Sequence, residues 1–210
     1  MASDPQTWAE LKASVAEWLN RSDLTAKIPE LVAFAERRFN RIIIVPEREA
    51  VATATMSGER MAVPADFWQL RSLFIDGDPR IALEQVSPST LRTSYAVQVT
   101  GKPRVFAIID EQFVFGPSPD DAYNVEIDYY ATIPALGDSQ ATNWLLTKHP
   151  DIYLYGTLLQ AEAYLWNDNR LEVWKAALDE AIGELMESGR RKHTSASPLR
   201  LRSPVAGWGI

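Results

Sequence analysis

The sequence predicts an α+β fold: a helix bundle formed by both ends of the chain, a small antiparallel β domain inserted between them, and an extended C-terminal tail. Three observations predict it. Apolar residues recur at helical spacing in the first and last thirds of the chain, they alternate in the middle third, and the final residues are basic and rich in Ser and Pro. We expect the bundle at 1–48 and 139–189, the β domain at 49–138 and the tail at 190–210.

Two helices are predicted in the first third. The first carries an apolar stripe and ends at the polar residues 20–23, and the second enters through Pro29, which suits a first helical turn. Glu36 is expected on the other faces of the second helix, together with Arg37, Arg38 and Arg41. Core packing is expected for four tryptophans of the helical regions: Trp8, Trp18, Trp166 and Trp174.

The middle third predicts short strands joined by turns. Strands are expected at 50–56, 60–64 and 67–76, followed by a turn at 77–79 and an antiparallel return at 80–84. Ser87 and Pro88 are typical of a helix start, which predicts a short helix ending near Ser94. A hairpin turning at Asp110 and Glu111, then a strand at 122–132, complete the domain.

The last third returns to helical spacing. A helix opening at 149–151 is apolar on nearly every side, so we expect it at the centre of the core. A break at 167–169 separates it from a final helix, whose apolar stripe contains Leu171, Trp174, Leu178, Ala181, Ile182 and Leu185.

The composition excludes several classes of function. The chain has no cysteine, which excludes disulfides, thiolate metal sites and a cysteine nucleophile. Its first residues lack the basic and apolar regions of a secretory signal, and the apolar segment 152–166 is too short to span a membrane. We therefore expect a soluble protein made inside the cell.

We recognise no catalytic or metal-binding motif in the sequence. The two histidines, His149 and His193, lie in different regions, which argues against a shared metal site. The segment 76–79 lacks the ligands that would complete a calcium loop, and 101–103 lacks the glycines of a phosphate-binding loop. We expect no enzyme, cofactor or metal. An enzyme using Asp76, Asp78 or Asp120 is the least favoured alternative.

The charges are distributed unevenly along the chain. The segment Gly189–Ile210 has five Lys and Arg but no Asp or Glu, so the rest has 16 cations against 28 acids, a charge of −12. Such an acidic body disfavours tight wrapping of nucleic acid, because phosphate contacts need cations. The basic tail leaves two interpretations: an arm that docks on another protein, or an arm that binds nucleic acid.

Six segments, taken in order, resemble one known family. They are "IPELVAFAERRFNR" (28–41), "VPADFWQLRSLFID" (63–76), "LEQVSPSTLR" (83–92), "GKPRVFAI" (101–108), "GPSPDDAYNVEIDYYATIPAL" (116–136) and "NWLLTKHPDIYLYGTLLQAEAYLWND" (143–168). Together they resemble the head-to-tail adaptor, or connector, proteins of tailed bacteriophages, especially the short-tailed (podovirus) type. The resemblance covers about residues 5–190.

The resemblance implies a structural virion protein with a helix bundle and an inserted β domain. Family members form a ring, typically a dodecamer, that binds beneath the portal of the DNA-filled head and supports the tail or nozzle proteins. DNA passes through such a ring without specific binding. The resemblance also implies a location at the head–tail junction after synthesis in the host cytoplasm, with no membrane contact and no catalytic residues.

Two groups of residues are candidates for contacts with partners. The tail residues expected to dock on the portal are Leu199, Arg200, Leu201, Arg202, Val205, Trp208 and Ile210. An extended segment of this length spans roughly 70 Å, so it can reach another protein. Arg37, Arg38 and Arg41 are either a solvated helix face or contacts to acidic helices of a neighbouring subunit, and the sequence leaves both open.

Overall fold

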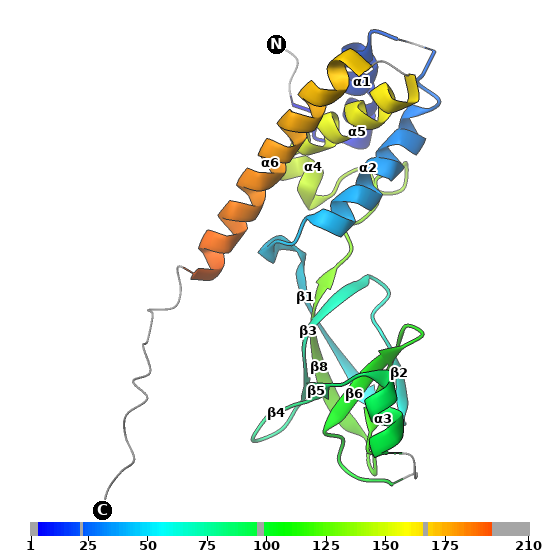
Figure 1. Cartoon of the computed structure of the whole chain (residues 1–210), viewed down its shortest axis with the longest axis vertical. Helices are drawn as coiled ribbons and strands as arrows, with labels where there is room; N and C mark the ends of the chain where they lie inside the picture. Colours follow the sequence, from blue (N-terminus) through cyan, green and yellow to red (C-terminus); the bar gives the residue numbers. More distant parts are fainter. Residues whose placement is uncertain (1–3, 22, 96–98, 166–167, 195–210) are drawn as a thin grey trace, which may run out of the picture. The chain divides into compact units, whose positions relative to one another are not determined.

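The computed structural model describes residues 4–21, 23–95, 99–165 and 168–194, which form two compact units (Figure 1). A helical unit contains the described residues up to Glu47 and from Ile133 onwards, and a β unit spans Arg48–Thr132. This confirms the α+β class, with the β unit inserted between helices. Residues 133–138, which we expected in the β domain, belong to the helical unit instead.

The described helical unit contains α1 (Trp8–Leu19), α2 (Ile28–Ile42), α4 (Trp144–Lys148), α5 (Pro150–Leu165) and α6 (Asp168–Thr194), and a 3₁₀ turn η1 (Pro46–Arg48) leads out of it. A capping box starts α1: the Thr7 hydroxyl accepts from the Glu10 amide at 3.3 Å, and the Glu10 carboxylate accepts from the Thr7 amide at 3.0 Å. Pro29 lies in the first turn of α2, as predicted.

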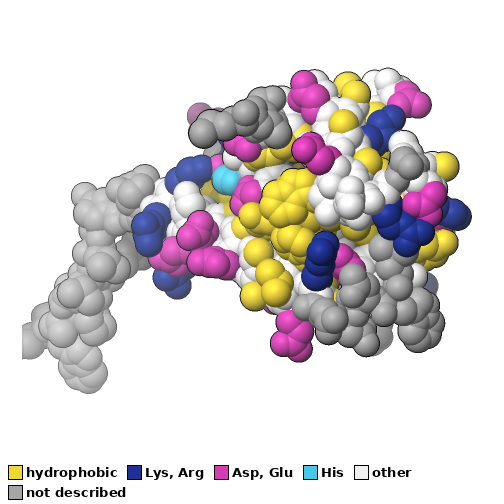
Figure 2. All heavy atoms as spheres, turned by 90° about the horizontal axis from the view of Figure 1, so that it is seen from above, with side chains coloured by type: hydrophobic (Ala, Val, Ile, Leu, Met, Phe, Trp, Pro, Cys, Tyr) yellow, Lys and Arg dark blue, Asp and Glu magenta, His cyan; other side chains and the backbone are white. Residues whose placement is uncertain are grey.

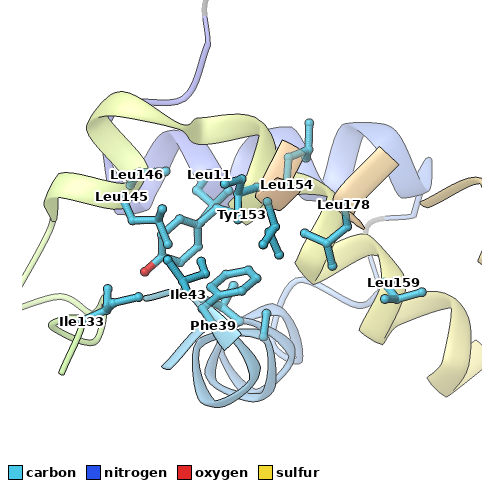
Figure 3. Packing of buried hydrophobic residues seen from close by; sticks show 14 of the residues in the cluster. Leu11, Phe39, Ile43, Ile133, Leu145, Leu146, Tyr153, Leu154, Leu159 and Leu178 are labelled. Atoms are coloured by element: carbon cyan, nitrogen blue, oxygen red, sulfur yellow. The ribbon is translucent and has the colours of Figure 1, made fainter. Parts of the chain in front are cut away.

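The core of the helical unit is built around α5, which packs against α1, α2, α4 and α6. Figure 3 shows the rings of Tyr153 from α5 and Phe39 from α2 meeting in this core, edge to face at 5.3 Å between centroids. An added Cβ at Gly156 would lie 2.8 Å from Cε1 of Phe39, so the glycine permits the two helices to approach closely.

The four tryptophans have different surroundings. Trp8 is buried, as expected, whereas the Trp18 side chain remains 46% exposed. Trp18 lies near the end of α1, where its ring meets that of Trp174 in a T-shaped arrangement with 5.4 Å between the centroids. Trp174 is itself partly buried, and Trp166 lies outside the described residues. The prediction of core packing was therefore wrong for Trp18.

Two four-stranded sheets form the β unit. The first contains β1 (Glu49–Met56), β3 (Phe67–Ile75), β4 (Ile81–Ala82) and β8 (Tyr123–Ala131), in the order β1-β8-β3-β4. The second contains β2 (Arg60–Ala62), β5 (Glu84–Gln85), β6 (Val105–Ile109) and β7 (Gln112–Gly116), in the order β2-β7-β6-β5. Helix α3 (Pro88–Ser94) packs on β6.

The predicted strand at 80–84 proved to be two strands. β4 pairs antiparallel with β3, but β5 pairs parallel with β6 in the other sheet. Leu83 lies between them and is buried, so the chain crosses between sheets while keeping an apolar side chain in the core. The hairpin was predicted correctly: Asp110 and Glu111 have φ angles of 52° and 55°, as a tight β6–β7 turn requires.

The C-terminal helix is longer than predicted, because α6 continues to Thr194 and residues 190–194 are helical rather than extended. Arg190 and Arg191 pair with Glu187 one turn earlier, and the Lys192 ammonium contacts the Glu47 carboxylate. The Lys192–Glu47 contact and the packing of Gly189 beside Val45 and Pro46 hold the last turns of α6 on the unit. Among the described helices, none has the length and apolar character that a membrane span requires.

Candidate subunit and portal interfaces

A buried polar cluster fixes the segment that returns from the β unit. The Glu36 carboxylate, on a residue only 6% exposed, accepts from the Leu136 amide at 2.8 Å and from the Tyr153 hydroxyl at 3.0 Å. Asn143 donates to the Tyr153 hydroxyl at 2.6 Å and to the Pro134 carbonyl at 2.7 Å. These bonds tie α2, α5 and the segment between them together, which makes the helical unit a rigid support for surface contacts.

The position of Glu36 corrects the expectation that it lies on an outer face. It falls in register with Val32, Phe39 and Ile43, all of which are buried. The sequence shows this helical spacing of four, three and four residues. A carboxylate, however, is almost never fully buried unless it is paired, and the expectation therefore placed Glu36 on a face towards solvent. Burial raises the pKa of the Glu36 carboxyl above its ordinary value, although its two hydrogen bonds act in the opposite direction.

The three candidate arginines of α2 have different roles. The Arg38 guanidinium lies 3.2 Å from the Asp179 carboxylate of α6, so its charge is used within its own subunit. Arg37 is exposed and its guanidinium lies over the ring of Phe34, 5.6 Å from the centroid. Arg41 is also exposed, one turn further along the helix. Arg37 and Arg41 therefore present their charges to the surroundings of the subunit.

Large hydrophobic side chains are also exposed on the helical unit. Figure 2 shows such side chains gathered at the centre of one face, with acidic and basic side chains interspersed around them. Among the described residues of this unit, the exposed large hydrophobics are Trp18, Phe34, Ile44, Tyr164, Val173 and Met186. Apolar surface rimmed by charges is typical of a protein contact rather than of a nucleic-acid groove.

The predicted portal-docking residues Leu199, Arg200, Leu201, Arg202, Val205, Trp208 and Ile210 lie outside the described residues. The structure reduces the number of cations that belong to the tail. Three of the five cations assigned to it, Arg190, Arg191 and Lys192, belong to α6 and are paired with Glu187 or Glu47. A free basic arm would thus have only Arg200 and Arg202, which weakens the nucleic-acid alternative.

The acidic residues considered for catalysis lie in exposed turns. Asp76 accepts from the Gly77 amide at 3.1 Å and lies 3.8 Å from Arg80, and Asp120 accepts from the Tyr123 hydroxyl at 2.7 Å. His149 ends α4, donating its amide to the Leu145 carbonyl, and His193 lies in α6. Over the described ranges, no group of three or more His, Asp or Glu residues is arranged to hold a metal ion.

The β unit contains a hollow of about 370 Å³ between α3 and the second sheet. Its walls include Leu91 and Tyr95 from α3, Phe115 from β7 and the charged Arg60 and Arg92. Polar and apolar residues both line the hollow, and Glu59 is its acidic member.

Comparison with known protein families gives a match over most of the chain. Residues 6–202 match the family of the SU10 adaptor protein, which includes both units and most of the chain. The chain belongs to the SU10 adaptor family. It is therefore a bacteriophage structural adaptor and a component of the virion. A search of curated proteins gave no match. The resemblance found from the six sequence segments is confirmed, although the short-tailed type is only compatible with this family.

Proposed function

We propose that this SU10 adaptor family member forms a ring that binds beneath the portal, joins the DNA-filled head to the tail and surrounds part of the DNA channel. The family match over residues 6–202 supports this proposal, since it includes the helical unit, the inserted β unit and the start of the tail. We further propose that the ring is a dodecamer, that tail or nozzle proteins bind below it, and that subunits are made in the host cytoplasm before assembly.

The portal contact is assigned to the seven tail residues Leu199, Arg200, Leu201, Arg202, Val205, Trp208 and Ile210. Burying each apolar side chain contributes about 1.5–3 kcal/mol. Ordering each backbone residue costs about 1–2 kcal/mol. One tail is therefore a marginal anchor. A ring docks many tails at once, and the effective concentration after the first contact makes the joint stable.

The charge of the body suits a channel for DNA. Residues 1–194, which include the three cations at the end of α6, carry 19 Lys and Arg against 28 Asp and Glu, so the body of every subunit would bring a charge of −9 to the ring. Carboxylates facing the lumen repel the DNA backbone, so DNA passes without being retained. This predicts that the assembled ring does not bind duplex DNA at physiological ionic strength.

Deletion of residues 195–210 tests the tail contact. The cut is placed after Thr194 because α6 runs to that residue and Lys192 contacts Glu47, so a cut at 190 would also damage the helical unit. We expect a folded body with unchanged circular dichroism and no retention by purified portal in a sedimentation assay. Portal binding equal to that of the full chain would contradict the assignment.

Two matched sets of substitutions separate the docking arm from a nucleic-acid arm. Leu199→Ala, Leu201→Ala and Trp208→Ala together remove apolar anchors, whereas Arg200→Ala and Arg202→Ala remove only charge. We expect the apolar set to abolish portal binding and the charge set to weaken it. A tail that binds duplex DNA with strong salt dependence, lost in the charge set, would instead support the nucleic-acid alternative.

A further inference from the structure

An exposed strip on α6 has features that its own subunit does not use. We define the α6 strip as Val173, Ala176, Glu180, Gly183 and Glu184, which follow one another at helical spacing and are all exposed. Val173 is 60% exposed. Within the described part of the chain, the carboxylates of Glu180 and Glu184 form no ion pair. The α6 strip is therefore acidic, with small residues between the charges.

Gly183 is the most informative member of this strip. An added Cβ would meet nothing within 4 Å, so the fold of the subunit does not require a glycine there. A glycine inside a helix is less favourable than alanine by about 1 kcal/mol. Together with Glu184, Glu187, Ser188 and Arg191, it forms a shallow hollow of about 450 Å³. A glycine that is unfavourable in the subunit is explained when another surface approaches closely at this position.

The complementary surface lies on α2. We define the α2 strip as Phe34, Arg37 and Arg41, three exposed residues spaced by one helical turn each. Phe34 is 44% exposed and lies beneath the Arg37 guanidinium. The α2 strip is therefore apolar at one end and basic along the rest, and the α6 strip is apolar at Val173 and acidic further along.

The direction and level of the two helices favour pairing between these strips. Arg38 pairs with Asp179, and further along both segments Lys192 contacts Glu47. The helices α2 and α6 therefore run in the same direction, with residues 38 and 179 at the same height along them. Figure 1 shows α2 and α6 on either side of α5 in this view, and the Arg38–Asp179 ion pair bridges the two helices within the subunit. Rotation about an axis along these helices preserves both direction and level.

We propose that the α2 strip of one subunit packs on the α6 strip of the next subunit in the ring. Phe34 lies against Val173 and Ala176, Arg37 pairs with Glu180, and Arg41 pairs with Glu184, while Gly183 admits the close approach. Arg37 and Arg41 are separated by about 6 Å along their helix, as are Glu180 and Glu184, so both pairs form together. Two different surfaces in contact give a head-to-tail arrangement of subunits, which forms a ring where the rotation between neighbours closes.

This inference rests on the proposed ring, and cross-linking tests it directly. The chain has no native cysteine, so Arg37→Cys with Glu180→Cys supplies the only two thiols. We expect a short bismaleimide to give a ladder of covalent oligomers when this variant assembles on purified portal. The control Arg38→Cys with Asp179→Cys joins positions within one subunit, and we expect only products of monomer size.

Charge exchange provides a second test. Arg37→Glu with Arg41→Glu places like charges opposite one another, and we expect the concentration needed for ring assembly to rise at least about ten-fold. Adding Glu180→Arg and Glu184→Arg to the same chain restores the pairs and should restore assembly. Lys175→Glu with Arg92→Glu makes the same change in net charge at exposed positions outside both strips and should leave assembly unchanged.

The outcomes distinguish this interface from the proposed function. If the unmodified chain forms a ring on the portal but the Arg37→Cys, Glu180→Cys variant yields only monomers, the interface is wrong and the adaptor function stands. If the unmodified chain neither binds portal nor forms a ring, the proposed function fails, and this interface fails with it.

Discussion

At the scale of single residues, Glu36 shows how a polar group joins segments far apart in the sequence. Its carboxylate receives hydrogen bonds from Leu136 and Tyr153, which lie beyond the whole inserted unit. Glu36→Ala would leave the Leu136 amide and the Tyr153 hydroxyl without this acceptor. We expect a loss of about 1–3 kcal/mol in the free energy of unfolding. Chemical denaturation of the full chain measures this loss.

Glu36 also predicts a pH dependence of stability. Burial raises the pKa of this carboxyl in the folded state. At neutral pH the charged carboxylate therefore lowers the free energy of unfolding. That cost falls as pH drops through the folded pKa and is gone below the unfolded value of about 4.5. The Glu36→Gln variant lacks the charge. We expect wild type to gain stability relative to this variant as pH falls from neutral towards the unfolded value of about 4.5, and a constant difference would contradict the prediction.

At the scale of elements, two helical glycines should respond in opposite directions to alanine. Gly183 of α6 faces open space, so Gly183→Ala should raise the free energy of unfolding of the subunit by about 1 kcal/mol. Gly156 of α5 faces the Phe39 ring, so Gly156→Ala should lower it by about 1–3 kcal/mol through overpacking. Thermal unfolding of both variants tests the pair, and equal shifts would contradict the packing described for α5.

The spacing of apolar residues predicted the long helices and strands, because the buried face of each one appears in the sequence as a regular recurrence of apolar residues. It did not predict α4, whose start depends on the Asn143 side chain accepting from the Leu146 amide at 2.8 Å and on a tertiary bond to Tyr153. The end of α6 was also misplaced, since the helix is held past residue 189 by contacts to Val45 and Glu47. Arg37 and Arg41 were correctly grouped as surface residues, but the partner of Arg38 on α6 depends on the folded bundle.

At the scale of the whole molecule, the β unit should fold without the helices. It has its own core, formed by Met56, Leu73, Ile75, Leu83, Phe106, Phe113, Phe115, Val125, Ile127 and Tyr129. Its two ends are already joined, because β1 pairs with β8 from Glu49 opposite Tyr130, and Arg48 donates to the Ala131 carbonyl at 2.8 Å. Excision therefore cuts the chain where both ends lie side by side.

A fragment of residues 47–133 is thus expected to give dispersed amide resonances and a cooperative unfolding transition. The variant Phe113→Ala is the matched control, because it removes a fully buried ring from this core and should cost the fragment about 3–5 kcal/mol. In the full chain, the same substitution should lower the transition of the β unit and leave that of the helical unit in place, since the two cores are separate clusters. A single transition that shifts as a whole would show instead that the units unfold as one, and that the bundle depends on its insertion for stability.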